Sequence, residues 1–235
     1  DRVVDAGEII VVTPSRAAAR NMISKAVSLG YEAHGEEIMT GLGVVMLTLE
    51  MPEGQDGASA IRELESWEPS AVAGVNHAYP TQAASRRGDV REYAGTLLGW
   101  KPSGCSATTR VGLLDTAIAP DRRYDVTSAD FSRHAGPLEP AEHGTAILDL
   151  LFAPGMLDDL EVFHADVVSA TGPAGAAAGV DTMLRGLDWL VRQDVRLINV
   201  SLSGPYNKIL DIGFQRAGDR GVILVAAAGN DGPGQ

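Results

Sequence analysis

The chain has 235 residues, 45% of them hydrophobic, and a formal net charge of -12 at pH 7. This length and apolar content suffice for a substantial core in one or two domains, and they exclude an intrinsically disordered chain. The acidic balance argues against nucleic acid as a main partner, because phosphate binding requires a basic surface. Cys105 is the single cysteine, which excludes an internal disulfide, and no run of 18 apolar residues predicts a membrane span.

The first 79 residues have the pattern of a compact α+β unit. Ser15 is a suitable N-cap for the first helix, and Gly30 is suited to end it. The apolar periodicity predicts strands and helices in the order β-α-β-β-α-β, which is the split βαβ pattern of ferredoxin-like folds. The predicted elements are Glu8–Thr13, Arg16–Leu29, Tyr31–Met39, Gly43–Glu50, Ala58–Trp67 and Ala71–Tyr79.

The segment Pro80–Thr109 has few periodic apolar positions, so we expect a linker that becomes irregular structure, with a short helix near Val90–Leu98. Arg86-Arg87 is either an exposed processing site or two solvated arginines. From Arg110 onward, apolar runs alternate with amphipathic stretches, which predicts an α/β unit with a parallel sheet. The chain is therefore divided into residues 1–79, 80–109 and 110–235. The runs of the last part are Val111–Leu114, Gly144–Phe152, Val162–Ala170, Val180–Val191, Leu197–Leu202, Ile209–Ala217 and Val222–Ala228.

Polar residues of complementary chemistry follow three of these predicted elements. Asp115, Ser201 and Asn230 stand at or just after strand ends, and His143 stands at a helix start. Because the carboxyl ends of parallel strands face one crevice, these side chains are expected to converge. An orienting carboxylate, an imidazole base and an amide donor to an oxyanion are components of acyl-transfer catalysis. The remaining histidines, which lack this neighbourhood, are expected to be structural or solvent-exposed: His34, His77, His134 and His164.

From Arg110 onward the sequence resembles the subtilisin-like serine proteases. Asp115-Thr116-Ala117 follows an apolar run as the family's aspartate motif does, with alanine in place of the usual glycine. His143-Gly144-Thr145 matches the histidine motif, although Ala146–Asp149 departs from its usual continuation. Asn199–Gly204 resembles the segment that pairs with substrate, and Ala227–Asn230 resembles the opposite pocket wall with its asparagine.

The resemblance implies a role for each matching residue. His143 would accept the proton of the nucleophile, Asp115 would fix its tautomer, and Asn230 would donate to the oxyanion. Substrate would be bound by Ser201, Leu202, Ser203 and Gly204 on one side and by Ala227, Ala228 and Gly229 on the other. Asp231 would either favour basic residues in the pocket or serve as a turn residue. The implied partners are polypeptides, and the implied location is secreted or periplasmic.

The resemblance also gives the first 79 residues a function. Subtilisin-like enzymes commonly carry a β-α-β-β-α-β propeptide that assists folding and inhibits the active site with its C-terminal tail. Gly74–Tyr79 resembles such a tail, so we expect self-cleavage near Tyr79 and the propeptide in the chain's own cleft. Calcium is common in the family, but no ligand set can be traced in this sequence, and we expect no other cofactor.

The family's nucleophilic serine motif does not occur in the sequence, and neither does a G-x-S-x-G elbow. We therefore expect the chain to be an N-terminal piece of a longer protease that is inactive alone, with an apolar sheet edge at Val222–Ala228 open to pairing or oligomerisation. The alternative is a non-catalytic inhibitor or chaperone module with a partial protease domain. A nucleotide-binding α/β protein is a third reading, but no phosphate-binding glycine motif supports it.

Overall fold

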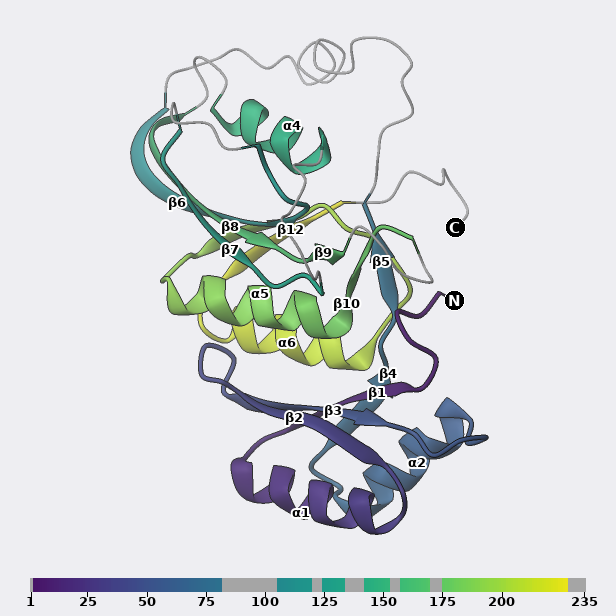
Figure 1. Cartoon of the computed structure of the whole chain (residues 1–235). Helices are drawn as coiled ribbons and strands as arrows, with labels where there is room; N and C mark the ends of the chain where they lie inside the picture. Colours follow the sequence, from purple (N-terminus) through teal and green to yellow (C-terminus); the bar gives the residue numbers. More distant parts are fainter. Residues whose placement is uncertain are drawn as a thin grey trace.

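The computed structural model describes residues 2–81, 105–119, 124–133, 142–152, 157–169 and 175–227. The elements form two stacked units, in which helices lie between a lower antiparallel sheet and an upper parallel one (Figure 1). The short helix expected near Val90–Leu98 and the pair Arg86-Arg87 lie outside the described residues.

The N-terminal unit has the element order that the sequence predicts, and its antiparallel sheet runs β2-β3-β1-β4. Helix α1 is capped by Ser15, whose side chain accepts from the backbone N–H of Ala18 at 3.2 Å. Asp56 caps α2 in the same way through Ser59 at 3.0 Å. The elements are β1 (Glu8–Thr13), α1 (Arg16–Ser28), β2 (Glu32–Met39), β3 (Val44–Glu50), α2 (Gly57–Trp67) and β4 (Val72–Val75).

The second unit contains the predicted parallel sheet, five strands in the order β12-β11-β6-β8-β7. Helices α5 and α6 cover one face of this sheet, and α4 covers the other (Figure 1). Its elements are β6 (Cys105–Asp115), β7 (Val126–Asp130), α4 (Glu142–Leu151), β8 (Leu157–Asp166), α5 (Val180–Arg192), β11 (Leu197–Val200), α6 (Lys208–Gly218) and β12 (Ile223–Ala226).

A small third sheet joins the two units. Its first strand lies where the sequence predicted part of a longer strand. Strands β5 (Ala78–Pro80), β10 (Ala177–Gly179) and β9 (Val168–Ser169) form it in the order β5-β10-β9. The single strand predicted over Ala71–Tyr79 is wrong, because the chain leaves the first sheet at Asn76. The buried Asn76 side chain instead accepts from Val180 N at 2.7 Å, so the following residues pair with the second unit.

The sequence analysis also placed the start of one strand too late and missed another strand. Strand β6 starts at Cys105, inside the segment expected to be irregular, and β7 was not predicted. Both strands are polar over these residues, so their hydrophobic pattern is weak, and pairing with β8 is what orders them.

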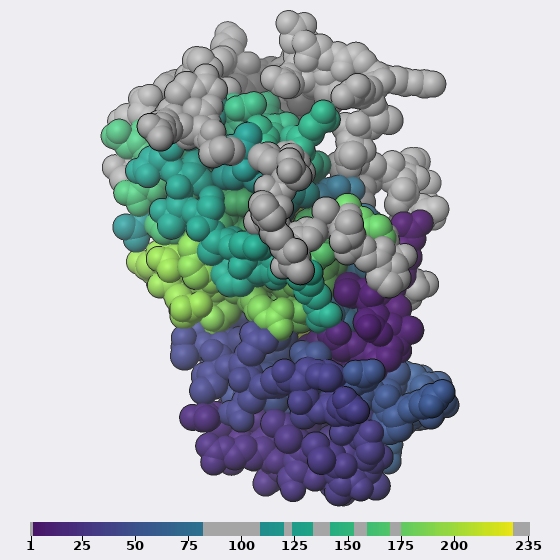
Figure 2. Space-filling model, viewed as in Figure 1, coloured from purple at the N-terminus to yellow at the C-terminus, as the bar shows by residue number. Residues whose placement is uncertain are grey.

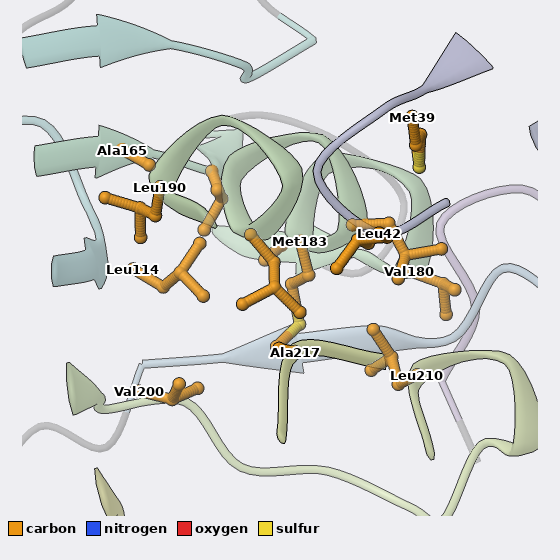
Figure 3. Packing of buried hydrophobic residues seen from close by; sticks show 14 of the residues in the cluster. Met39, Leu42, Leu114, Ala165, Val180, Met183, Leu190, Val200, Leu210 and Ala217 are labelled. Atoms are coloured by element: carbon orange, nitrogen blue, oxygen red, sulfur yellow. The ribbon is translucent and has the colours of Figure 1, made fainter. Parts of the chain in front are cut away.

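The hydrophobic core is continuous between the units. Every residue of β1 is buried, because Ile9 and Val11 face α1 and α2 while Ile10 and Val12 face α5 and α6. Figure 3 shows Met39 and Leu42 of the N-terminal unit beside residues of α5 and α6 such as Met183 and Leu210. In the space-filling view, the purple and blue N-terminal residues meet the green residues of α5 directly (Figure 2).

An ionic network adds to this apolar interface. The carboxylate of Asp181, which is fully buried at the start of α5, pairs with Arg133 at 2.9 Å and Arg185 at 2.5 Å. Each arginine continues to the N-terminal unit, Arg133 to Glu8 at 2.7 Å and Arg185 to Glu37 at 2.6 Å. These carboxylates raise the pKa of both guanidinium groups above the ordinary value, against the desolvation that lowers it. The two units are therefore joined through one buried charge that organises two arginines.

Candidate active site

Asp115 and His143 lie together although 28 residues separate them. Asp115 is the last residue of β6 and is fully buried, and His143 is the second residue of α4. His143 Nδ1 lies 2.7 Å from Asp115 Oδ1, and the same oxygen accepts from Thr116 N at 2.7 Å. Because an ionised carboxylate can only accept, the proton of the neutral imidazole lies on Nδ1 and Nε2 is left as the basic nitrogen.

The neighbouring motif residues explain why the helix approaches the strand end so closely. Gly144 N donates to Thr116 Oγ1 at 3.0 Å, and a Cβ on Gly144 would lie 2.6 Å from Thr116 O. Thr145 Oγ1 accepts from Ala119 N at 3.0 Å. The glycine after the histidine is thus required by contact with the aspartate segment, and these contacts hold the imidazole against the carboxylate.

The strand registers bring the other predicted residues to the same edge of the sheet. Leu114 pairs with Val200, and Val200 pairs with Ala226, so Asp115, Ser201 and Ala227 follow adjacent strand ends. Ala227 N also donates to Val200 O at 3.2 Å. Asp115 and Ser201, two of the residues expected to converge, therefore lie at the same edge of the sheet, and Ala227 lies there as well.

A cavity of about 640 Å³ lies beside these strand ends. Its lining includes four residues that the sequence assigned to substrate binding: Leu202, Ser203, Gly204 and Ala227. Ser201 is not part of the lining, and its hydroxyl accepts from Asn199 Nδ2 at 2.6 Å. The predicted residues Ala228, Gly229 and Asn230, together with Asp231, lie outside the described residues.

The end of the N-terminal unit enters this cavity. Tyr79 lines it and is buried, with its hydroxyl donating to Pro205 O at 2.8 Å. Burial raises the pKa of this phenol well above its usual range. Gly204 is needed beneath the ring, since a Cβ there would lie 2.5 Å from Tyr79 Cδ1. Tyr79 therefore occupies space that would otherwise be open to a ligand.

Two polar residues of β8 next to Asp115 were missed or given no role in the sequence analysis. His164 and Asp166 are buried, and Asp166 pairs in register with Asp115. Burial raises the pKa of Asp166 to about 7, with further contributions from the charges of Asp130 and Asp115. Burial also lowers the pKa of His164, whose Nε2 donates to Thr116 O at 2.8 Å. Their signal in the sequence is an alternation of polar residues within an otherwise apolar strand.

Within the described residues, no group of three or more His, Cys, Asp or Glu side chains near these positions is arranged to share a cation. The one group within reach of a common cation is formed by Glu32, His34 and Glu50 of the N-terminal unit, all exposed. Calcium takes six to eight oxygen ligands, whereas this group contributes an imidazole that already bonds Glu50 at 2.8 Å. The group therefore does not fit calcium.

Within the described residues, no helix is both long and apolar enough to span a membrane. No protein-family model matches the chain. The chain is 23% identical over 146 residues to the minor extracellular protease Epr of Bacillus subtilis, covering 58% of this chain and 22% of that protein. It is 29% identical over 133 residues to the thermostable alkaline protease of Halalkalibacterium halodurans, covering 52% of this chain and 36% of that protein. The chain thus spans about a quarter to a third of the length of these relatives.

Among solved structures, the crystal structure of fervidolysin from Fervidobacterium pennivorans, a keratinolytic enzyme related to subtilisin, matches 96% of this chain. The TM-score is 0.59, the sequence identity is 15%, and 40% of fervidolysin is covered, so the likeness concerns the fold. In its parallel sheet, in the order of its aspartate and histidine motifs and in its sequence, this chain is similar to the subtilisin-like alkaline proteases.

Proposed function

We propose that the chain is the precursor part of a serine endopeptidase, in which the N-terminal unit is a propeptide that assists folding and inhibits the active site. The observation that carries this proposal is the path of residues 78–81. They leave the N-terminal unit and run as an extended segment along the cavity that Leu202 and Ser203 help to line.

The contacts of this segment are those of a bound peptide. Ala78–Pro80 pairs with β10 on one side, and Thr81 forms a bridge with Leu202 on the other. Ser203 N donates to Pro80 O at 3.4 Å. Peptides that add as a strand to exposed edges gain affinity from main-chain hydrogen bonds and specificity from side-chain pockets. A tail held in this way would exclude other polypeptides, which supports an inhibitory role.

The geometry of Asp115 and His143 supports a role in peptide hydrolysis. Nε2 of His143 would take the proton of a serine hydroxyl as its oxygen attacks the peptide carbonyl, and would then donate that proton to the leaving amine. Asp115 would hold the required tautomer and stabilise the imidazolium. Asn230 would donate to the oxyanion, a contribution of about 10²- to 10³-fold in rate in comparable sites. The nucleophilic serine would come from chain outside these 235 residues.

We also propose a secreted location for the chain and a role for the exposed edge of its parallel sheet. The relative from Bacillus subtilis is an extracellular protease, which supports a secreted location for this chain. Strand β12 lies at the sheet edge with Ile223 and Val225 exposed at 64% and 50%. Such an apolar edge is suited to further strands of a larger catalytic domain, and it is also where an oligomer of the isolated chain would form.

A test requires the native protein extended through its serine motif. Mass spectrometry is expected to find a self-cleavage site between Ala71 and Arg91, and a serine-directed phosphonate is expected to label the enzyme. His143→Ala should abolish the cut, whereas His34→Ala, which changes an exposed histidine of the N-terminal unit, should not. Cleavage that persists in His143→Ala would contradict the proposal. A gene that stops directly after Gln235 would favour the non-catalytic inhibitor or chaperone module.

A further inference from the structure

Three buried polar side chains lie on the sheet face beneath α4. Asp115 ends β6, and His164 and Asp166 alternate on the neighbouring strand β8, with exposures of 0%, 1% and 3%. Asp115 pairs in register with Asp166, and Leu113, which packs toward α4, pairs with His164. Residues in register on parallel strands point to the same face, and residues two apart on one strand do so as well. All three side chains therefore lie on the side of the sheet from which His143 approaches.

Each of these side chains has one polar atom without a hydrogen-bond partner, namely Asp115 Oδ2, His164 Nδ1 and Asp166 Oδ2. Their other polar atoms are bonded. Asp115 Oδ1 accepts from His143 and from the backbone, and Asp166 Oδ1 accepts from Val168 N at 3.2 Å. Buried polar atoms are rarely left unpaired, so three in one cluster beside a candidate catalytic pair require an explanation.

The unpaired atoms differ in what they can offer. His164 Nε2 donates to Thr116 O, so it carries the ring proton and Nδ1 is an acceptor. Asp115 Oδ2 is an acceptor as well. A protonated Asp166 would supply the missing donor, directly or through a buried water. Burial raises the pKa of Asp166 to about 7, so both of its protonation states are populated near neutral pH.

The charges around Asp166 favour its neutral form. Asp115 of β6 and Asp130 of β7 are the charged groups that act on its carboxyl, and both are negative. Among the described side chains of β8, the other titratable group on this face is His164, for which burial lowers the pKa and favours the neutral ring. From α4, His143 bonds Asp115 at 2.7 Å, and Asp115 is the in-register neighbour of Asp166.

We propose that Asp166 is a positioning residue that sets the base strength of His143 through Asp115. As a neutral acid, Asp166 donates into the cluster and holds Asp115 in place. Once ionised, it withdraws that donor and adds a second negative charge beneath the imidazole, so the affinity of His143 for a proton rises. The relevance of this coupling to catalysis rests on the proposed function, in which His143 is the general base. The electrostatic coupling between Asp166 and His143 itself does not depend on that function.

The coupling can be measured in the 235-residue chain without any peptidase activity. A unit charge roughly 8 Å away, at an effective dielectric constant of about 20 to 40, shifts a pKa by about one unit. Nitrogen NMR of the histidine rings between pH 5 and 9 should therefore give a lower midpoint for His143 in Asp166→Asn than in the wild type. The asparagine keeps the shape and the donor. Glu161→Gln, which removes an exposed carboxylate from the same strand, should leave the midpoint unchanged.

Two outcomes would overturn this inference. One is a His143 midpoint in Asp166→Asn that matches the Glu161→Gln control. The other is carbon NMR of the wild-type Asp166 carboxyl showing an ordinary midpoint near that of a solvent-exposed aspartate, and this second measurement holds even if the asparagine variant does not fold. A longer protein without peptidase activity, in which His143 still responds to Asp166, would refute the proposed function and leave the coupling intact.

Discussion

Tyr79 should be the main anchor of the segment that joins the N-terminal unit to the cavity. Its ring is 5% exposed, rests on Gly204, and donates its hydroxyl to Pro205 O at 2.8 Å. Truncating a buried aromatic residue to alanine costs about 3–5 kcal/mol, of which the single hydrogen bond accounts for about 1 kcal/mol. Tyr79→Ala should therefore lower the free energy of unfolding by about 3–5 kcal/mol, and Tyr79→Phe by about 1 kcal/mol.

The assay is urea denaturation combined with hydrogen exchange of the β10 amides that pair with residues 78–80. Tyr206→Ala is the matched control, because that tyrosine is 77% exposed and should change stability by no more than about 0.5 kcal/mol. Equal effects of Tyr79→Ala and Tyr206→Ala would refute the reasoning. The reasoning would also be refuted if Tyr79→Ala exchanged faster throughout the parallel sheet, without a selective loss of protection at β10.

The pH dependence of the same variants gives a second measurement. The folded pKa of the Tyr79 phenol is raised by burial, so its contribution to stability is complete below the unfolded value of about 10 and is lost as the pH rises above it. The wild type should therefore lose more stability than Tyr79→Phe between neutral pH and the strongly alkaline range. Parallel stability curves for the two proteins would contradict this assignment.

Two further substitutions test the packing between the units and within the second unit. Asp181→Asn should lower the free energy of unfolding, measured by urea denaturation, by about 3–5 kcal/mol, because it leaves two arginines without their shared buried carboxylate. Asp194→Asn, at an exposed ion pair, should lower it by less than about 1 kcal/mol. Similar losses in the two variants would show that the buried charge is not essential. Gly186→Ala should destabilise the fold by about 1–3 kcal/mol, because the new Cβ would lie 2.6 Å from Leu114 Cδ2. Gly218→Ala, which has open space around it, should be neutral or should stabilise the fold by up to about 1 kcal/mol. Thermal unfolding measures both effects. Gains for both glycine variants would contradict the close packing of α5 on β6.

Much of the fold could be predicted because its signals are local. The continuous apolar run at Glu8–Thr13 and the caps Ser15 and Asp56 define elements within a few residues, and the order of elements then restricts the topology. Strand β7 and the start of β6 could not be predicted in this way. Their residues are largely polar, and their extended conformation depends on hydrogen bonds to β8.

The residues of the candidate site also differ in whether the sequence could predict their positions. Asp115 and His143 could be paired because motifs and parallel strand ends restrict where those side chains lie, and the 2.7 Å contact agrees with that expectation. The unusual environments of His164 and Asp166 could not be recognised from the sequence, because burial and register, rather than residue type, create them.

The sequence by itself determined the two units, the parallel sheet and the residues whose chemistry suits acyl transfer, because periodicity, caps and motifs act over short distances. Only the tertiary structure decided that the chain turns at Asn76, that Tyr79 enters the cavity, and that Asp166 lies beside Asp115 on the neighbouring strand. Those features depend on which distant surfaces exclude water together, and no local pattern encodes that.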